Sequence, residues 1–123
     1  MMSLNAAAQG LAWFAVVITA GIAAVCIPDP RAGMRRLDHI LSALPHVMLG
    51  RYLAITGFTA FVAVLGDLRV MAAWAVALSF MAFADTVIYA RLGKPYMKQL
   101  TAGLAACAVL AVVLAAMISN GAA

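Results

Sequence analysis

The sequence predicts an all-α membrane protein: an up-and-down bundle of four transmembrane helices, with a short interfacial helix between helices 1 and 2. Hydrophobic residues make up 67% of the 123 residues, well above the roughly 45–50% of soluble domains, and the mean hydropathy is +1.09. Four apolar runs each approach the roughly 20 residues that a helix needs to cross a bilayer. We therefore expect a single integral membrane domain over residues 1–123, with lipid as its solvent.

The first apolar run predicts a transmembrane helix over about residues 4–27. It carries no charged side chain, and "PDP" at 28–30 ends it because proline breaks a helix. Apolar side chains then recur at near-helical spacing over residues 33–44, and mostly charged or polar side chains fill the opposite face. Such a two-faced pattern is typical of a short helix that lies in the membrane interface.

Three further membrane-spanning helices follow in the chain. They are predicted over about residues 47–66, 70–90 and 99–118. Pro45 suits the first turn of the helix that it precedes, because proline lacks the N–H that this position leaves unused. The segments "GDLR" at 66–69 and "RLGKPYMK" at 91–98 contain glycine, proline and charges, and they predict short connections between the spans.

Small residues form a stripe along the last helix. Its members, which recur every four residues, are Gly103, Cys107, Ala111 and Ala115. Small side chains allow two helix backbones to approach closely, so the stripe predicts a contact with another helix. Cys107 and Cys26 both lie in apolar runs, where cysteine usually acts as a small buried apolar residue, and we expect neither a disulfide nor a metal site from them.

The basic residues predict the orientation of the chain. Seven of the eight lie in or beside the connections that follow helices 1 and 3, and only Arg69 lies on the opposite side. The positive-inside rule therefore places these two connections in the cytoplasm and both termini outside it. Because these charges mark membrane boundaries, where they meet lipid head groups, the pI of about 9.6 does not predict nucleic-acid binding.

A pair of opposite charges inside the predicted spans is the main candidate site. Asp85 lies about 9 Å from the cytoplasmic end of the third helix, and Arg51 lies about 6 Å inside the same end of the second. These helices are expected to form an antiparallel hairpin, so the two charges can meet, and each is the other's best partner in a medium of low dielectric constant. Tyr89 lies one turn from Asp85 on the same face and joins the candidate site. The pair either joins helices 2 and 3 as a structural contact, as intramembrane charges usually do, or lines a pocket that orients the polar head of a lipophilic molecule.

Tyr52 and His46 are weaker members of this site. Tyr52 follows Arg51 directly but points in another direction, and His46 lies at the start of the second helix, above the charge pair. No helix carries two histidines and a carboxylate at ligand spacing, and the two cysteines are far apart in the chain. The sequence therefore predicts no metal and no cofactor.

Three short segments carry a resemblance to a known family: "GIAAVCIPDPRAG", "GRYLAITG" and "ADTVIYARLGKP". With these segments in this order, the whole chain resembles small bacterial four-helix membrane proteins of the DoxX-like type, in particular an uncharacterised branch of them. That branch often has an arginine followed by an acid where this chain has Arg51 and Tyr52, and an aspartate where it has Asp85. The resemblance implies a four-helix bundle in the bacterial inner (plasma) membrane and no particular activity.

The sequence leaves three functions open. It favours a binding or accessory membrane protein that holds a quinone-like or lipid-like molecule or docks on a larger membrane complex, with the Arg51 and Asp85 pair near the cytoplasmic face. The alternatives are a proton-coupled homodimeric transporter that uses Asp85 and a membrane-embedded isomerase with Asp85 and either Tyr89 or His46 as acid and base. A non-enzymatic role is favoured because no second acid or intramembrane histidine is expected to face Asp85.

Overall fold

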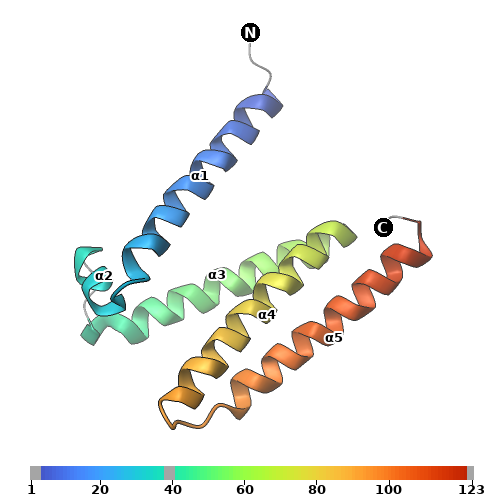
Figure 1. The fold of residues 1–123 in the computed structure, drawn as a ribbon. Coiled ribbons are helices and arrows are strands. Elements are labelled where there is room, and N and C mark those ends of the chain that lie inside the picture. Colours follow the sequence, from blue (N-terminus) through green and yellow to red (C-terminus); the bar gives the residue numbers. More distant parts are fainter. Residues whose placement is uncertain (1–3, 38–40, 122–123) are drawn as a thin grey trace. The chain divides into compact units, whose positions relative to one another are not determined.

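The computed structural model describes the backbone of residues 4–37 and 41–121, and the side chains in these ranges except 8–12 and 41. Within these residues every regular element is helical (Figure 1). The elements are α1 (Leu4–Cys26), α2 (Pro30–Arg36), a short 3-10 helix (Leu41–Ala43), α3 (Leu44–Leu65), α4 (Leu68–Arg91) and α5 (Met97–Ser119). The chain divides into two compact units, Met1–Arg51 and Tyr52–Ala123, and the boundary falls inside α3.

In the first unit, α2 folds back against the end of α1. Asp29 caps α2, because its Oδ1 accepts hydrogen bonds from the backbone N–H groups of Arg31 (3.1 Å) and Ala32 (3.4 Å), and Pro30 is the first helical residue. Gly33 is buried at the contact with α1: a Cβ at this position would lie 2.7 Å from Cα of Cys26. Only a residue without a side chain allows this approach.

The boundaries of α2 differ from those expected for the interfacial helix over 33–44. The helix begins at Pro30, because Asp29 caps it and proline is favoured at the first helical position. The segment that ends the preceding apolar run therefore also starts α2. It ends at Arg36, residues 38–40 lie outside the described residues, and Leu44 already belongs to α3. The placement of α2 in the membrane interface stays a prediction.

The boundaries of α3, α4 and α5 lie within one to three residues of the predicted ones. Pro45 is the second residue of α3, so this helix starts earlier than the expected residue 47. Gly66, at φ +69°, follows the last residue of α3. Asp67 caps α4 by accepting a hydrogen bond from the backbone N–H of Arg69 (2.9 Å). A cap is a stronger start signal than the first apolar residue, which explains why α4 begins at Leu68 rather than at residue 70.

The second unit is built on the contact between α4 and α5, which lie side by side (Figure 1). Ala75 and Ser79 of α4 and Gly103 and Val113 of α5 are buried. Trp74, on another side of α4, donates a hydrogen bond from Nε1 to Oγ1 of Thr59 (3.0 Å) and so ties α4 to the part of α3 in this unit. The hairpin of α4 and α5 thus supplies most of the core, to which α3 adds the buried Val62.

The stripe of small residues in α5 is confirmed at its start and wrong further along. Gly103 is buried. Cys107 is exposed, contrary to the expectation of a buried residue, although its Sγ donates to Oγ of Ser79 on α4 (3.8 Å). Ala111 and Ala115 are exposed. The less exposed side of α5 continues instead through Ala106, Leu110, Val113 and Met117. This spacing of alternately three and four residues keeps one face toward a nearly antiparallel neighbour, whereas strict steps of four rotate around the helix.

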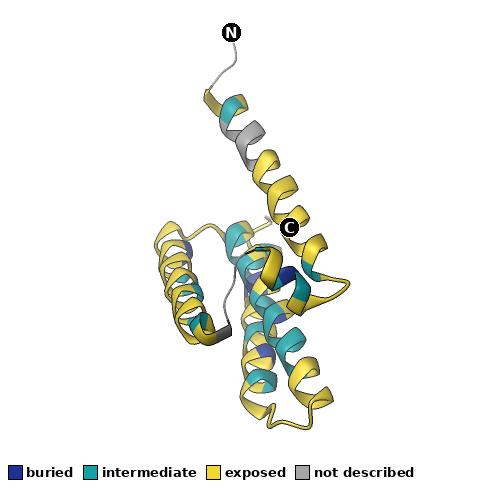
Figure 2. Ribbon diagram, turned by 90° about the vertical axis from the view of Figure 1, so that its left-hand side faces the viewer, coloured by how far each residue is buried: buried dark blue, intermediate teal, exposed yellow. Residues whose placement is uncertain are grey.

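Three of the described helices are long and apolar enough to cross a membrane: α3, α4 and α5. Only 6% of the apolar window of α3, 6% of that of α4 and 17% of that of α5 is buried inside the structure, and Figure 2 shows exposed residues along most of the ribbon. Apolar side chains left outside a fold need lipid around them, so this is an α-helical membrane protein. Among the α1 residues whose side chains are described, the apolar stretch is Trp13–Cys26, and the four-helix bundle stays a prediction.

Candidate functional site

The predicted charge pair is divided between the two units. Arg51 is the last residue of the first unit and Asp85 lies in the second, so their pairing stays a prediction from the sequence. Tyr52 opens the second unit and is exposed, and its carbonyl accepts a hydrogen bond from the Thr56 hydroxyl (2.9 Å). His46 is an exposed residue in the first turns of α3.

Asp85 lies on the side of α4 that also carries Trp74. The two residues are separated by about three turns of helix, which returns a side chain to nearly the same direction. Trp74 bonds to α3, whereas the buried Ser79 is near Cys107 of α5. Asp85 is half-buried, and its contact with the second predicted helix stays a prediction from the sequence.

The end of α4 places Tyr89 beside the connection to α5. The backbone N–H of Lys94 donates to the carbonyl of Tyr89 (2.9 Å), and that of Gly93 donates to the carbonyl of Ala90 (3.1 Å). Gly93 has φ +67°. These two bonds and the left-handed glycine form a Schellman motif, which closes a helix by turning the chain back over its last turn. The motif brings Lys94 back to Tyr89, one turn beyond Asp85.

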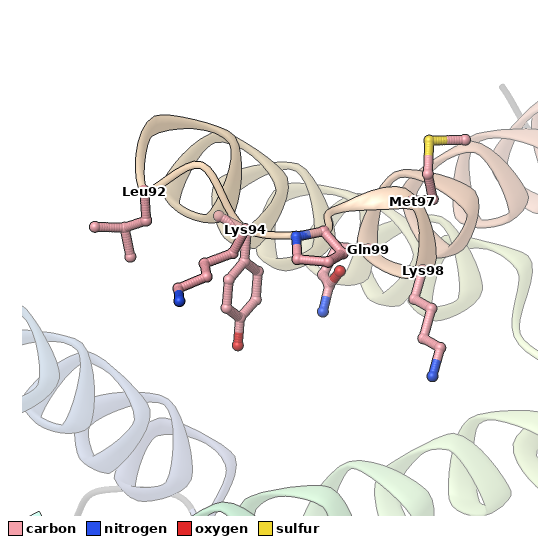
Figure 3. A pocket seen from close by; sticks show the side chains of 7 residues that line it. Leu92, Lys94, Met97, Lys98 and Gln99 are labelled. Carbon is pink, nitrogen blue, oxygen red and sulfur yellow. The ribbon is translucent and has the colours of Figure 1, made fainter.

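An open pocket of about 620 Å³ lies at this connection between α4 and α5 (Figure 3). Its lining residues are Tyr89, Leu92, Lys94, Pro95, Met97, Lys98 and Gln99. Figure 3 shows that Lys94, Lys98 and Gln99 extend to the same side of the connection. Two ammonium groups, a phenol and an amide thus share the pocket with the apolar groups of the other three residues.

The start of α5 adds backbone donors to the same place. The first backbone bond of this helix runs from the N–H of Leu100 to the carbonyl of Tyr96 (3.0 Å), so the N–H groups of the preceding three residues have no acceptor within the helix. The side chain of Tyr96 makes no capping hydrogen bond, and no acidic residue lies in the first turn. The positive end of the helix dipole is therefore not neutralised by this segment of the chain.

The sequence predicts Tyr89 as a site residue but misses Lys94, Lys98 and Gln99. The two lysines enter the sequence argument only as charges that set the orientation, because the pattern "Y…GKP" is interpreted as a connection and not as a Schellman motif. That motif is a local signal that predicts the approach of Lys94 to Tyr89. Lys98 and Gln99 join them only because α5 starts directly after the turn.

The hydrogen-bond donors and positive charges that line the pocket can bind a polar or anionic group. Among the described residues, no group of three or more His, Cys, Asp or Glu side chains is placed to hold a metal ion. Comparison with known protein families, with curated proteins and with solved structures finds no match to this chain.

Proposed function

We propose that this protein is a small integral membrane binding protein that holds a lipophilic molecule by its polar head. The observation that carries the proposal is the pocket at the connection between α4 and α5. Ligand pockets are lined mainly by apolar groups with a few polar groups that fix the orientation of the ligand, and this pocket combines Leu92, Pro95 and Met97 with Tyr89 and two lysines.

The location of the pocket supports a ligand that is only partly polar. The pocket lies where two helices able to cross a membrane end and begin, α4 at Arg91 and α5 at Met97. The neighbouring apolar side chains of Ile88 and Leu104 are exposed and, in a membrane, face the acyl chains. A molecule with a polar head and an apolar tail can therefore place its head in the pocket and its tail along the helices.

Asp85 lies on α4 one turn deeper than Tyr89 and is not among the residues that line the pocket. Its distance from the end of α4 suits a side chain that orients the polar head of a bound lipophilic molecule near one membrane face. A carboxylate that must reach both faces in turn is expected nearer to the middle of a helix. This position favours binding over proton-coupled transport.

Native mass spectrometry of the protein purified in a mild detergent tests the proposal. We expect a retained lipophilic molecule, and we expect Tyr89→Ala to lose most of it because the phenol ring forms part of the pocket. Phe80→Ala is the control: it removes an aromatic side chain from an exposed position of the same helix that does not line the pocket. Wild-type protein that carries no lipophilic molecule, or that carries only a partner subunit, would overturn the proposal.

A further inference from the structure

We propose that the pocket at the connection between α4 and α5 binds the phosphate group of an anionic phospholipid, with Lys94 and Lys98 as its cationic ligands. This inference rests on the proposed function and specifies the class of the lipophilic molecule. It is carried by three features of the second unit: the charges that line the pocket, the start of α5, and the apolar surface beside them.

The charge of the pocket is entirely positive. Lys94 and Lys98 line it, and none of its seven lining residues is an acid. Both side chains extend to the same side of the connection (Figure 3). An ammonium group donates a charge-assisted hydrogen bond to a phosphate oxygen, so each lysine can contribute one such bond to a phosphate in the pocket.

The start of α5 supplies further donors for the same phosphate. The free N–H groups of the first turn and the positive end of the helix dipole attract an anion. Most helices neutralise this end with a capping side chain or an acid, but Tyr96 makes no side-chain cap and the first turn of α5 contains no acid. Gln99 in this turn adds an amide that donates to a phosphate oxygen.

The surroundings select a lipid phosphate over a free one. The pocket is open, and its volume of about 620 Å³ is far larger than a bare phosphate needs. Leu92 and Met97 line it and are 65% and 63% exposed, so they offer apolar contact to the part of a phospholipid next to its head group. The basic residues also predict that this connection lies in the cytoplasmic leaflet, where anionic lipids gather around juxtamembrane lysines.

Lipid titration followed by native mass spectrometry tests this inference. The full-length protein, delipidated in a mild detergent, is titrated separately with phosphatidylglycerol, with phosphatidylcholine and with inorganic phosphate. We expect phosphatidylglycerol to bind most tightly. Because a hydrogen bond to a charged group contributes about 1.5 kcal/mol or more, Lys94→Gln and Lys98→Gln should each weaken this binding about tenfold, and the double variant about 100-fold.

Two controls separate a specific site from a general positive charge. Arg91→Gln removes one charge beside the same connection, but Arg91 does not line the pocket, and we expect a change of less than about twofold. The double variant with Lys94→Arg and Lys98→Arg keeps the charge and should retain phosphatidylglycerol. It also tests the site if the glutamine variants do not elute as monodisperse protein.

The inference is overturned if phosphatidylcholine binds as tightly as phosphatidylglycerol, or if Arg91→Gln weakens binding as much as the lysine variants. It is also overturned if millimolar inorganic phosphate displaces the lipid, because the site then recognises free phosphate. These outcomes differ from failure of the proposed function. If the proposed function fails, no lipophilic molecule copurifies at all. If only the inference fails, a molecule copurifies, and its binding does not change when Lys94 and Lys98 are substituted.

Discussion

Gly103 packs against the ring of Phe83 at the centre of the contact between α4 and α5, and Gly103→Ala tests whether this contact holds the second unit together. An alanine Cβ at this position would lie 2.7 Å from Cε1 and 2.9 Å from Cδ1 of Phe83, whereas ordinary van der Waals contact begins at 3.4 Å. The ring or the helix must therefore move by several tenths of an ångström. Overpacking of this kind costs about 1–3 kcal/mol.

The control for this substitution is Gly57→Ala in α3. An alanine Cβ at residue 57 meets no atom within 4 Å. Both substitutions gain the same preference of alanine over glycine inside a helix, about 1 kcal/mol. The difference in unfolding free energy between the two variants therefore isolates the steric conflict, and we expect Gly103→Ala to be the less stable by about 1–3 kcal/mol.

Equilibrium unfolding in mixed micelles with increasing sodium dodecyl sulfate, followed by near-UV circular dichroism, measures this difference. Because the conflicting atoms belong to the Phe83 side chain rather than to backbone, Phe83→Leu should make room for the new methyl group. A double-mutant cycle of Gly103→Ala and Phe83→Leu should therefore show a coupling energy of about 0.5–3 kcal/mol. Equal stability of the two glycine variants, or strictly additive effects in the cycle, would refute the packing described for α5.

The remaining predictions concern α4. Trp74→Phe removes the hydrogen bond to Thr59 and should lower the unfolding free energy by about 0.6–1.7 kcal/mol. Adding Thr59→Val to this variant should lower the unfolding free energy little further, because the bond is already lost. Fully additive losses of unfolding free energy would show that the bond is not made. If Arg51 and Asp85 form an ion pair, Arg51→Asp and Asp85→Arg should each reduce the yield of monodisperse protein, because a charge without a partner costs about 2.5–3.5 kcal/mol inside a membrane helix. The double variant should recover most of the yield, and a yield no better than that of the single variants would remove the pair from the site.

Several parts of the fold could be predicted from short stretches of sequence. Apolar length predicts α3, α4 and α5 as membrane-spanning helices. Asp67 is a helix cap, and Gly66 and Gly93 have positive φ angles at the ends of α3 and α4. These features depend on side chains within one turn of the backbone that they satisfy, so the order of residues alone decides them. Asp29 and Pro30 carry the same kind of information and predict the start of α2 once they are recognised as a cap.

Other features depend on how one helix meets another, and no single segment contains that information. Gly103 and Ala111 look equivalent in a stripe of small residues, yet only Gly103 is buried against α4. Lys98 is the second residue of α5 and Tyr89 belongs to α4, yet they line one pocket. Composition, length and capping are local and fix where each helix begins and ends. The crossing of two helices fixes which faces touch and which side chains gather, because a small rotation about a helix axis moves every side chain on it to a different neighbour.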